Sequence, residues 1–342
     1  MRFWLGCTAR GEMIPTVFVE PPWAEGSRQL YNAICEMQAS IEARENRPVL
    51  FAEANFCERS SALDFLEFAI DRIEGLLLRE GETDALTNLQ RYAESVRTGL
   101  EAVDEALFRR LRGEVASGVC TGDALRRRIA DLAGPATPGG GQPAEGYDAL
   151  DALVNGILLE ESAPENVGQP EPEMIFYQPT PARIVLEMVE KMDFRPDDIF
   201  YDIGSGLGQV AILVHLLTGV QTRGVEIEPA YADYARRCAE GLNLPAVQFI
   251  RGDARTAAYA NGSIFFLYTP FIGQMLDQVL ERLRQVSTRQ QIRLCTFGPC
   301  TPQVAGQLWL QPLDQTSLHE NRLALWKSTP APAPWGRTRT IR

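Results

Sequence analysis

The spacing of apolar residues predicts a helical N-terminal part and an α/β C-terminal part. Over residues 83–112, apolar side chains step by three and four positions from Leu86 to Leu107 without a break. This spacing places them on one face of a helix, as in a helical bundle or an antiparallel helical hairpin. The seam is plain bundle core in one interpretation, and a dimer interface or a substrate cover in the other. The same pattern predicts helices over residues 26–45, 59–80, 122–132 and 147–160.

Further along the chain, short apolar runs alternate with helical patterns, which is typical of a parallel sheet flanked by helices. Residues 264–268 form a continuous apolar run, as expected of a strand that is buried on both faces. Thr180 is placed to cap a helix whose first residue is Pro181, the position that proline prefers. Strands are predicted over residues 199–203, 222–227, 247–250, 264–268 and 291–297, followed by a terminal hairpin over 308–312 and 322–326.

A glycine-rich stretch lies where the first of these strands passes into a helix. Gly204, Gly206 and Gly208 allow the backbone to turn sharply and to approach a ligand closely. Their spacing is neither that of dinucleotide-binding proteins nor that of a phosphate-binding P-loop. Asp202 precedes the first glycine by two positions, where an anion would not suit a pyrophosphate. The stretch therefore favours a ligand with a cationic amino-acid group.

Acidic residues also end the next two strands. Glu226 follows the first glycine turn by about 20 residues, the place of the acidic side chain that holds ribose hydroxyls in nucleotide-binding α/β folds. Asp253 is placed to meet an adenine amino group. Together with Asp202, these side chains would surround one adenosyl ligand, which predicts a class I S-adenosylmethionine-dependent methyltransferase. The alternative is an ordinary α/β turn with acidic residues on the surface.

Composition narrows the partners and the compartment. The 342 residues carry a formal net charge of −12, which disfavours nucleic acid as a partner and suits a basic protein or a small amine. The 7 cysteines are scattered and form no Cys-x-x-Cys pair, which predicts reduced thiols and a cytoplasmic protein. With 2 histidines distant in sequence, no metal site is expected. No apolar run approaches the roughly 18 residues of a membrane span.

The boundaries of the domains are predicted from glycine and proline content. Residues 134–146 are rich in both, which prevents a packed element and indicates a linker. A mostly helical domain at residues 1–133 is expected to act as a lid or in oligomerisation. The cofactor domain is expected at residues 147–328. The proline-rich tail, residues 329–342, is expected to be disordered.

Four further motifs together carry a family resemblance. They are Tyr177 and Thr180 with Val185 and Met188, then residues 202–210, then Gly-Val-Glu at 224–226, and then Arg-Gly-Asp at 251–253. Over about residues 174–300 the chain resembles the disruptor-of-telomeric-silencing family of non-SET histone lysine methyltransferases. The resemblance implies an α/β fold with a seven-stranded Rossmann-like sheet, S-adenosyl-L-methionine as cofactor and an amine as nucleophile. It implies that Tyr177 and Thr180 lie in the loop that covers the cofactor. The candidate cofactor-binding residues are Tyr177, Thr180, Asp202, Gly204, Ser205, Gly206, Gly208, Gln209, Glu226, Ile227, Asp253 and Ala254.

Two departures from that family concern the acceptor. The family ends its fourth strand in an Asn-Asn pair followed by Phe, whereas this chain has Tyr268-Thr269-Pro270-Phe271. Gln178-Pro179 replaces the family's Gly-Glu in the covering loop. Tyr268 and Thr269, with Tyr177, are the candidate catalytic residues, because ligands bind at the carboxyl ends of strands in open α/β sheets. Phe271 is expected either to wall the acceptor slot or to pack in the core.

Three functions are compatible with this pattern. The first is N-methylation of a protein lysine. The second is methylation of a small molecule under a helical lid made by residues 26–132. The third is a module that binds S-adenosylmethionine without catalysis, because the family's asparagine pair is replaced. The expected partner is thus a protein or small-molecule methyl acceptor, with a homodimer through the N-terminal helices as a further expectation.

Overall fold

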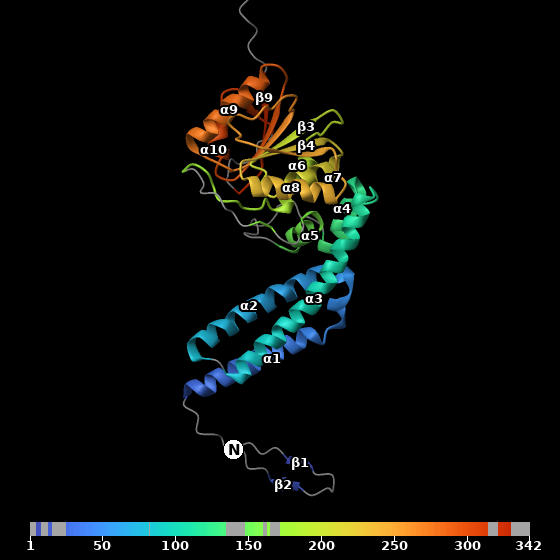
Figure 1. Ribbon diagram of the computed structural model, residues 1–342, viewed down its shortest axis with the longest axis vertical. Helices are drawn as coiled ribbons and strands as arrows, with labels where there is room; N and C mark the ends of the chain where they lie inside the picture. The colour runs from blue at the N-terminus through green and yellow to red at the C-terminus, as the bar shows by residue number, and fades with distance from the viewer. Residues whose placement is uncertain are drawn as a thin grey trace, which may run out of the picture. The chain divides into compact units, whose positions relative to one another are not determined.

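The computed structural model describes residues 5–7, 13–15, 25–81, 83–134, 148–159, 163–164, 172–313 and 321–329. The chain, traced in Figure 1, divides into two compact units. Unit 1 comprises Met1–Pro48 and Ala62–Gly99, and unit 2 comprises Val49–Ser61 and Leu100–Arg342. The predicted linker at 134–146 lies outside the described residues except for Gly134, and the predicted tail lies outside them except for Thr329.

Unit 1 is built from helices, as the apolar spacing predicts. It holds α1 (Glu25–Glu45), most of α2 (Phe56–Glu80) and the first half of α3 (Asp84–Ala116), with a two-stranded antiparallel pair, β1 (Leu5–Cys7) and β2 (Met13–Pro15). The guanidinium of Arg44 stacks 3.4 Å from the ring centroid of Phe65, and the hydroxyl of Tyr92 hydrogen-bonds Glu45. The buried side chains of this unit include Ile41, Leu66, Ile73, Leu86, Leu89 and Ala93.

Residues 49–61 belong to unit 2, and a buried ion pair links them to α3. This segment contains the short 3-10 helices η1 (Pro48–Phe51) and η2 (Glu53–Asn55) and the start of α2. The side chain of Arg59 is fully buried, and its Nε donates to Oδ1 of Asp104, in α3, at 2.6 Å. Its Nη1 donates to the backbone oxygens of Leu50 and Ala52. Because a broken buried pair leaves an uncompensated charge, this contact ties the segment to the second half of α3.

The sheet of unit 2 has seven strands in the order β5-β4-β3-β6-β7-β9-β8. Strands β3, β4, β5, β6 and β7 are parallel, and β9 pairs antiparallel with both β7 and β8. This arrangement confirms the predicted seven-stranded, Rossmann-like sheet that is closed by a terminal hairpin. The strands are β3 (Ile199–Ile203), β4 (Gln221–Glu226), β5 (Val247–Arg251), β6 (Ile264–Tyr268), β7 (Arg293–Phe297), β8 (Leu310–Pro312) and β9 (Ala324–Ser328).

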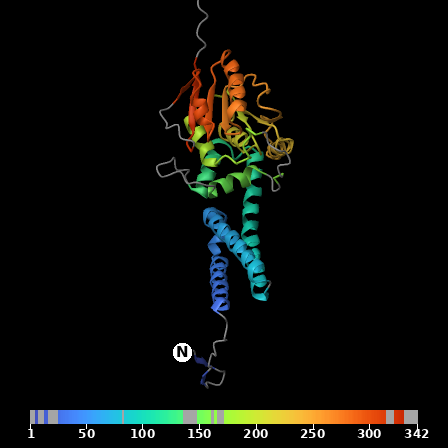
Figure 2. The same ribbon diagram turned by 90° about the vertical axis from the view of Figure 1, so that its left-hand side faces the viewer.

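Both faces of the sheet are covered, because successive strand residues point to opposite faces. In β3, Phe200 joins one apolar cluster and Tyr201 the other, and both are fully buried. The first cluster includes α4 (Gly122–Ala133), α5 (Ala149–Leu158), α6 (Ala182–Lys191), α7 (Gln209–Thr218) and α8 (Pro229–Gly241). The second includes α9 (Gly273–Ser287) and α10 (Thr301–Ala305). Figures 1 and 2 show the covered sheet from two directions.

The start of α6 differs from the prediction. The helix begins at Ala182, Pro181 occupies the N-cap position, and no side chain of that residue caps the helix. The expectation that Thr180 caps the helix and Pro181 begins it is therefore wrong. A residue before proline is pushed toward extended conformations, and the capping role passes to α5 instead. There, Oδ1 of Asp151 accepts a hydrogen bond from the N–H of Ala182 at 2.6 Å.

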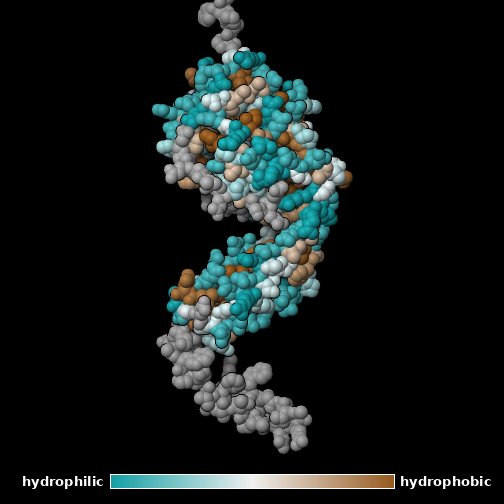
Figure 3. Space-filling view, in the orientation of Figure 1, coloured by the Kyte–Doolittle hydropathy of each residue, from teal (hydrophilic) through white to brown (hydrophobic). Residues whose placement is uncertain are grey.

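The visible face of unit 2 is largely hydrophilic, with scattered apolar patches (Figure 3). Within the described ranges, no helix is long and apolar enough to cross a membrane.

Candidate active site

The candidate residues gather where the parallel strands end. We call the side of the sheet at which β3 to β7 finish the carboxyl edge, and the opposite side the amino edge. Asp202 lies near the end of β3 and is in register with Gly224 of β4 and Phe266 of β6. Glu226 ends β4, Asp253 follows β5, and Tyr268 ends β6. In open α/β sheets this edge is where ligands bind.

The glycine turn follows β3 directly and is held against β4. The N–H groups of Gly204 and Ser205 both donate to the backbone oxygen of Val225, at 2.9 and 3.1 Å. Gly204 and Gly206 have φ of +79° and +51°, in the left-handed region that favours glycine. A Cβ added to Gly206 would lie 2.2 Å from a ring carbon of Tyr177. Only glycine lets the ring of Tyr177 approach the turn this closely.

Glu226 binds the glycine turn through its carboxylate. Oε2 accepts from the N–H of Gly206 at 2.7 Å, and Oε1 accepts from the N–H of Glu228 at 2.8 Å. Burial raises the pKa of Glu226, and the backbone donors act in the opposite direction. Each carboxylate oxygen has a second lone pair that can accept a ribose hydroxyl. Ile227, the next residue, is 42% exposed beside it.

Asp202 is the least satisfied polar group of the turn. Its side chain is buried, and Oδ2 has no hydrogen-bond partner among the residues that the structure describes. Burial, followed by the charge of Glu226, raises the pKa of Asp202 to about 8. Ser205 likewise buries its hydroxyl without a partner within the described chain. Buried polar atoms normally have a hydrogen-bond partner, so this arrangement indicates a ligand at the site. For a carboxylate, the most favourable partner is a cation.

Asp253 is engaged by an arginine on its own loop. Nη2 and Nε of Arg255 lie 2.6 and 2.8 Å from Oδ2 of Asp253. These bonds, led by the side-chain hydrogen bond, lower the pKa of Asp253 and keep it ionised. The side chain is 28% exposed, so its remaining lone pairs face solvent. The neighbouring backbone oxygen of Ala254 accepts from the hydroxyl of Tyr259 at 2.6 Å.

The covering loop is joined to the turn by a chain of hydrogen bonds. The hydroxyl of Tyr177 donates to Oε1 of Gln209 at 2.6 Å, and Nε2 of Gln209 donates to Oδ1 of Asn155 at 2.8 Å. The ring of Tyr231 meets Tyr177 edge-on, with centroids 5.4 Å apart. Thr180 lies partly exposed three residues after Tyr177. Neither Asn155 nor Asp151 was expected from the sequence. The available signal was a polar pair spaced by four residues on an otherwise apolar helix.

Tyr268 forms an aromatic wall at the end of β6. Its ring lies 5.0 Å from that of Phe297, between centroids, and its hydroxyl reaches Oε1 of Gln178 at 3.4 Å. Burial raises the pKa of Tyr268, so the phenol stays protonated at neutral pH. The two departures from the resembled family, at positions 178 and 268, therefore meet each other.

Thr269 points its hydroxyl into the fold. The residue is 4% exposed and has φ of +37°. Its Oγ1 donates to the backbone oxygen of Phe297 and accepts from the N–H of Cys300, both at 3.1 Å. Phe297 ends β7 and Cys300 follows it, so the hydroxyl fixes the turn after β6 to the end of β7. This is the geometry of a positioning residue, and the catalytic role expected for Thr269 stays a prediction.

Residues 173–175 run alongside residues 270–272. The N–H of Ile175 donates to the backbone oxygen of Pro270, and the N–H of Ile272 donates to that of Glu173. Pro270 packs on the glycine turn, since a Cβ added to Gly204 would lie 2.3 Å from its Cβ. Phe271 is 5% exposed and packs in the second apolar cluster, which is the core alternative of the two expected for it.

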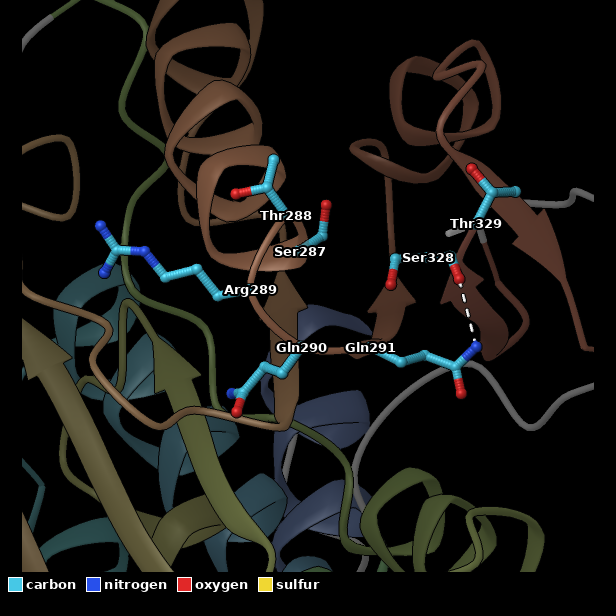
Figure 4. A pocket seen from close by; sticks show the side chains of 7 residues that line it. All are labelled: Ser287, Thr288, Arg289, Gln290, Gln291, Ser328 and Thr329. Carbon is cyan, nitrogen blue, oxygen red and sulfur yellow. Dashed lines mark hydrogen bonds between the residues drawn. The ribbon is translucent and has the colours of Figure 1, made fainter. Parts of the chain in front are cut away.

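A polar pocket of about 320 Å³ lies at the amino edge, away from these residues. Figure 4 shows its lining, from the segment that joins α9 to β7 and from the end of β9. Nε2 of Gln291 donates to the backbone oxygen of Ser328, and the hydroxyls of Ser287 and Thr288 are bonded to the last turn of α9. Its polar groups thus have structural partners. Elsewhere in the described ranges, no group of three His, Cys, Asp or Glu side chains is placed to hold a metal ion.

One family match supports the cofactor assignment. The family described as "Histone methylation protein DOT1" matches residues 175–254, from the covering loop to Ala254. No curated protein matches the chain. An RNA methyltransferase from Salinibacter ruber, solved with S-adenosyl-L-homocysteine, is 23% identical, covers 46% of this chain and 97% of its own, and has a TM-score of 0.36. A precorrin-6y C5,15-methyltransferase from Geobacter metallireducens is 15% identical over 46% of this chain and 93% of its own, with a TM-score of 0.36.

The chain is an S-adenosylmethionine-dependent methyltransferase of class I. It resembles the DOT1 histone methylation proteins over residues 175–254. The residues present fit the cofactor, because Oδ2 of Asp202 is buried, has no partner among the residues that the structure describes, and suits an ammonium group.

Proposed function

We propose that this methyltransferase acts on the side-chain amine of a lysine in a protein. The observation that carries the proposal is the match to histone methylation proteins over residues 175–254, which span the covering loop and all three acidic strand ends. The net charge of −12 agrees with a basic protein as partner.

We propose a division of roles among the residues of the carboxyl edge. Asp202 would bind the ammonium group of the cofactor, Glu226 the ribose hydroxyls and Asp253 the adenine amino group. Gly204, Ser205, Gly206, Gly208 and Gln209 would form the turn around it, with Tyr177 and Thr180 above and Ile227 and Ala254 beside the base. When bound, S-adenosylmethionine supplies a methyl group that is attached to a positively charged sulfur. After transfer of the methyl group, that sulfur is a neutral thioether.

The acceptor amine would enter beside Tyr268. Its hydroxyl donates toward Gln178, which leaves the oxygen lone pairs free to accept an N–H of the amine and orient it. The rings of Tyr268 and Phe297 exclude water and favour the neutral amine, because desolvation lowers an amine's pKa. The lone pair of the nitrogen would form the new N–C bond as the bond between the methyl carbon and the sulfur breaks, and the methylated ammonium would lose its proton to water. Thr269 would hold this wall in place.

A small-molecule acceptor and a cofactor-binding module without catalysis remain the competing functions. The decisive experiment incubates the protein and labelled S-adenosylmethionine with a lysate of the source organism, which is then separated by size. Label in a protein band supports the proposal, and label only in the small-molecule fraction overturns it. If no label is transferred while calorimetry shows cofactor binding, the acceptor proposal fails in favour of the non-catalytic module.

Three further expectations belong with this proposal. A cytoplasmic location rests on the scattered cysteines, and a homodimer through the N-terminal helices rests on their apolar seam. The division into a helical domain at 1–133 and a catalytic domain at 147–328 also stays a prediction. Sedimentation at several protein concentrations tests the dimer.

A further inference from the structure

Helix α5 lies outside the segment that matches the family, yet it contacts the cofactor turn through one side chain. Asn155 is partly exposed, whereas most of the apolar residues of the same helix are buried in the first cluster. Burial of α5 therefore does not depend on this side chain. Its Oδ1 accepts from Nε2 of Gln209, the first residue of α7 and the neighbour of Gly208.

We propose that Asn155 is a positioning residue for cofactor binding, which acts through Gln209 to hold the Tyr177 ring over the glycine turn. The inference rests on the proposed role of Tyr177 in covering the cofactor. It does not depend on the identity of the acceptor.

The direction of the hydrogen-bond chain makes Asn155 specific. A side-chain amide offers an oxygen at one end and an NH2 group at the other. Because the Tyr177 hydroxyl donates to Oε1 of Gln209, the amide presents its NH2 group toward α5. An acceptor at position 155 stabilises this orientation, and the observed contact at 2.8 Å supplies one. Without it, the amide is free to rotate and the hydroxyl of Tyr177 loses a fixed acceptor.

Helix α5, which carries Asn155, is itself held in place by hydrogen bonds of Asp151 and Asp148. Asp151 lies one helical turn before Asn155 and therefore on the same side of α5. Its Oδ1 accepts from the N–H of Ala182 at the start of α6, and its Oδ2 from the N–H of Asp148 at 3.0 Å. The side chains of Asp148 and Asp151 form a capping box that begins the helix. Helix α5 thus holds the start of α6 with one residue and the start of α7 with the next turn.

The last side chain of this hydrogen-bond chain, that of Tyr177, lies directly on the glycine turn. The Tyr177 ring contacts Gly206 so closely that a Cβ there would sit 2.2 Å from a ring carbon. The Tyr231 ring supports it from the side. A ring held on two sides and by its hydroxyl has one orientation, and this pre-organisation reduces what cofactor binding must order.

The test measures S-adenosylhomocysteine affinity by calorimetry, which needs no acceptor. Asn155→Ala is expected to weaken binding by about fivefold to tenfold, as for the loss of one partly buried hydrogen bond. Asn155→Asp keeps the acceptor oxygen and is expected to stay within about twofold of wild type. Ala152→Gly, at an exposed position of the same helix, loosens α5 without touching the chain and serves as the matched control.

A double-mutant cycle separates positioning from general loss of structure. If Asn155 acts through Tyr177, Asn155→Ala adds less than about twofold to the loss caused by Tyr177→Phe. Losses that multiply, or an Asn155→Ala variant that binds like wild type, would overturn the proposal. An Asn155→Asp variant as weak as Asn155→Ala would do the same. Absence of labelled protein in the lysate experiment, with these affinities as expected, would count against the lysine acceptor only.

Discussion

Two aspartates stand at the two ends of β3, and their surroundings are opposite. Asp198, at the amino edge, has its Oδ2 bonded by Nη2 of Arg293 at 2.6 Å and by the N–H of Arg195 at 2.7 Å. Its Oδ1 accepts from the hydroxyl of Ser263 at 2.7 Å. Asp202, at the carboxyl edge, is equally buried and leaves Oδ2 without a partner in the described chain.

The protonation of the two groups follows from these partners. Burial alone would raise the pKa of Asp198, but the donors, led by Arg293, lower it below its usual value. Nothing offsets burial at Asp202, and its pKa rises to about 8. We propose that Asp198 serves stability, whereas Asp202 is kept at a cost in stability for a ligand. Substitutions at the two positions should therefore have opposite effects.

The largest effect is expected on the amino edge. Asp198→Ala leaves the guanidinium of Arg293 without its carboxylate, and should lower the free energy of unfolding by about 3 kcal/mol. Affinity for S-adenosylhomocysteine should not change, because this edge faces away from the glycine turn. Denaturant unfolding and calorimetry measure the two quantities. Asp197→Ala, at the exposed neighbouring position, is the control, and a comparable loss there would refute the specific role of Asp198.

Asp202→Ala should show the reverse pattern. We expect cofactor affinity to fall by about a hundredfold, as for the loss of a charged hydrogen bond, with no fall in melting temperature. Asp202→Asn keeps the shape without the charge and should bind nearly as weakly. If either variant bound the cofactor like wild type in a calorimetric titration, the assignment of the glycine turn would be wrong.

Substitution of Thr269 tests whether this residue serves stability, as we expect of Asp198, or function, as we expect of Asp202. Thr269→Ala leaves the backbone groups of Phe297 and Cys300 unpaired, and should lower the free energy of unfolding by about 2 kcal/mol. Cofactor affinity should change by less than about threefold. Thr269→Ser retains the hydroxyl and should restore most of the stability. Lost turnover with unchanged stability would instead identify Thr269 as a catalytic residue.

A pH-dependent effect is expected from the titration of Asp202 in the absence of ligand. Its pKa is near 8 in the folded state and about 4 in the unfolded state, so between these values the unfolded state binds fewer protons. Stability from this group is therefore lost as pH rises from about 4 to about 8, by at most about 1.4 kcal/mol per pH unit. Asp202→Asn should remove this part of the slope. Identical slopes for wild type and variant, in unfolding at several pH values, would contradict it.

Local features of the site could be predicted from the sequence, whereas contacts between distant residues could not. The glycine turn and Asp202 follow from local patterns, because a strand, a turn and a helix occur within one short stretch. The hydroxyl partners of Thr269 lie about 30 residues further along, at the end of β7 and just after it, and no local pattern indicates them. Asn155 meets Gln209 across 54 residues for the same reason.

In the helical part of the chain, the sequence likewise predicts the helices but not the long-range side-chain contacts between them. The spacing of apolar residues correctly predicts α2 and α3, with ends displaced by a few residues. The ion pair between Arg59 and Asp104 joins positions 45 residues apart, and both residues belong to unit 2. Side chains that pair over such separations are decided by the fold and not by periodicity.

The most direct test of the account identifies the methylated group itself. Proteins labelled by the enzyme in lysate are hydrolysed, and the labelled amino acid is separated, with the Asp202→Ala variant treated in parallel. We predict label in methylated lysine with wild-type protein and none with the variant. Label confined to another amino acid or to small molecules, or label that persists with Asp202→Ala, would contradict the account.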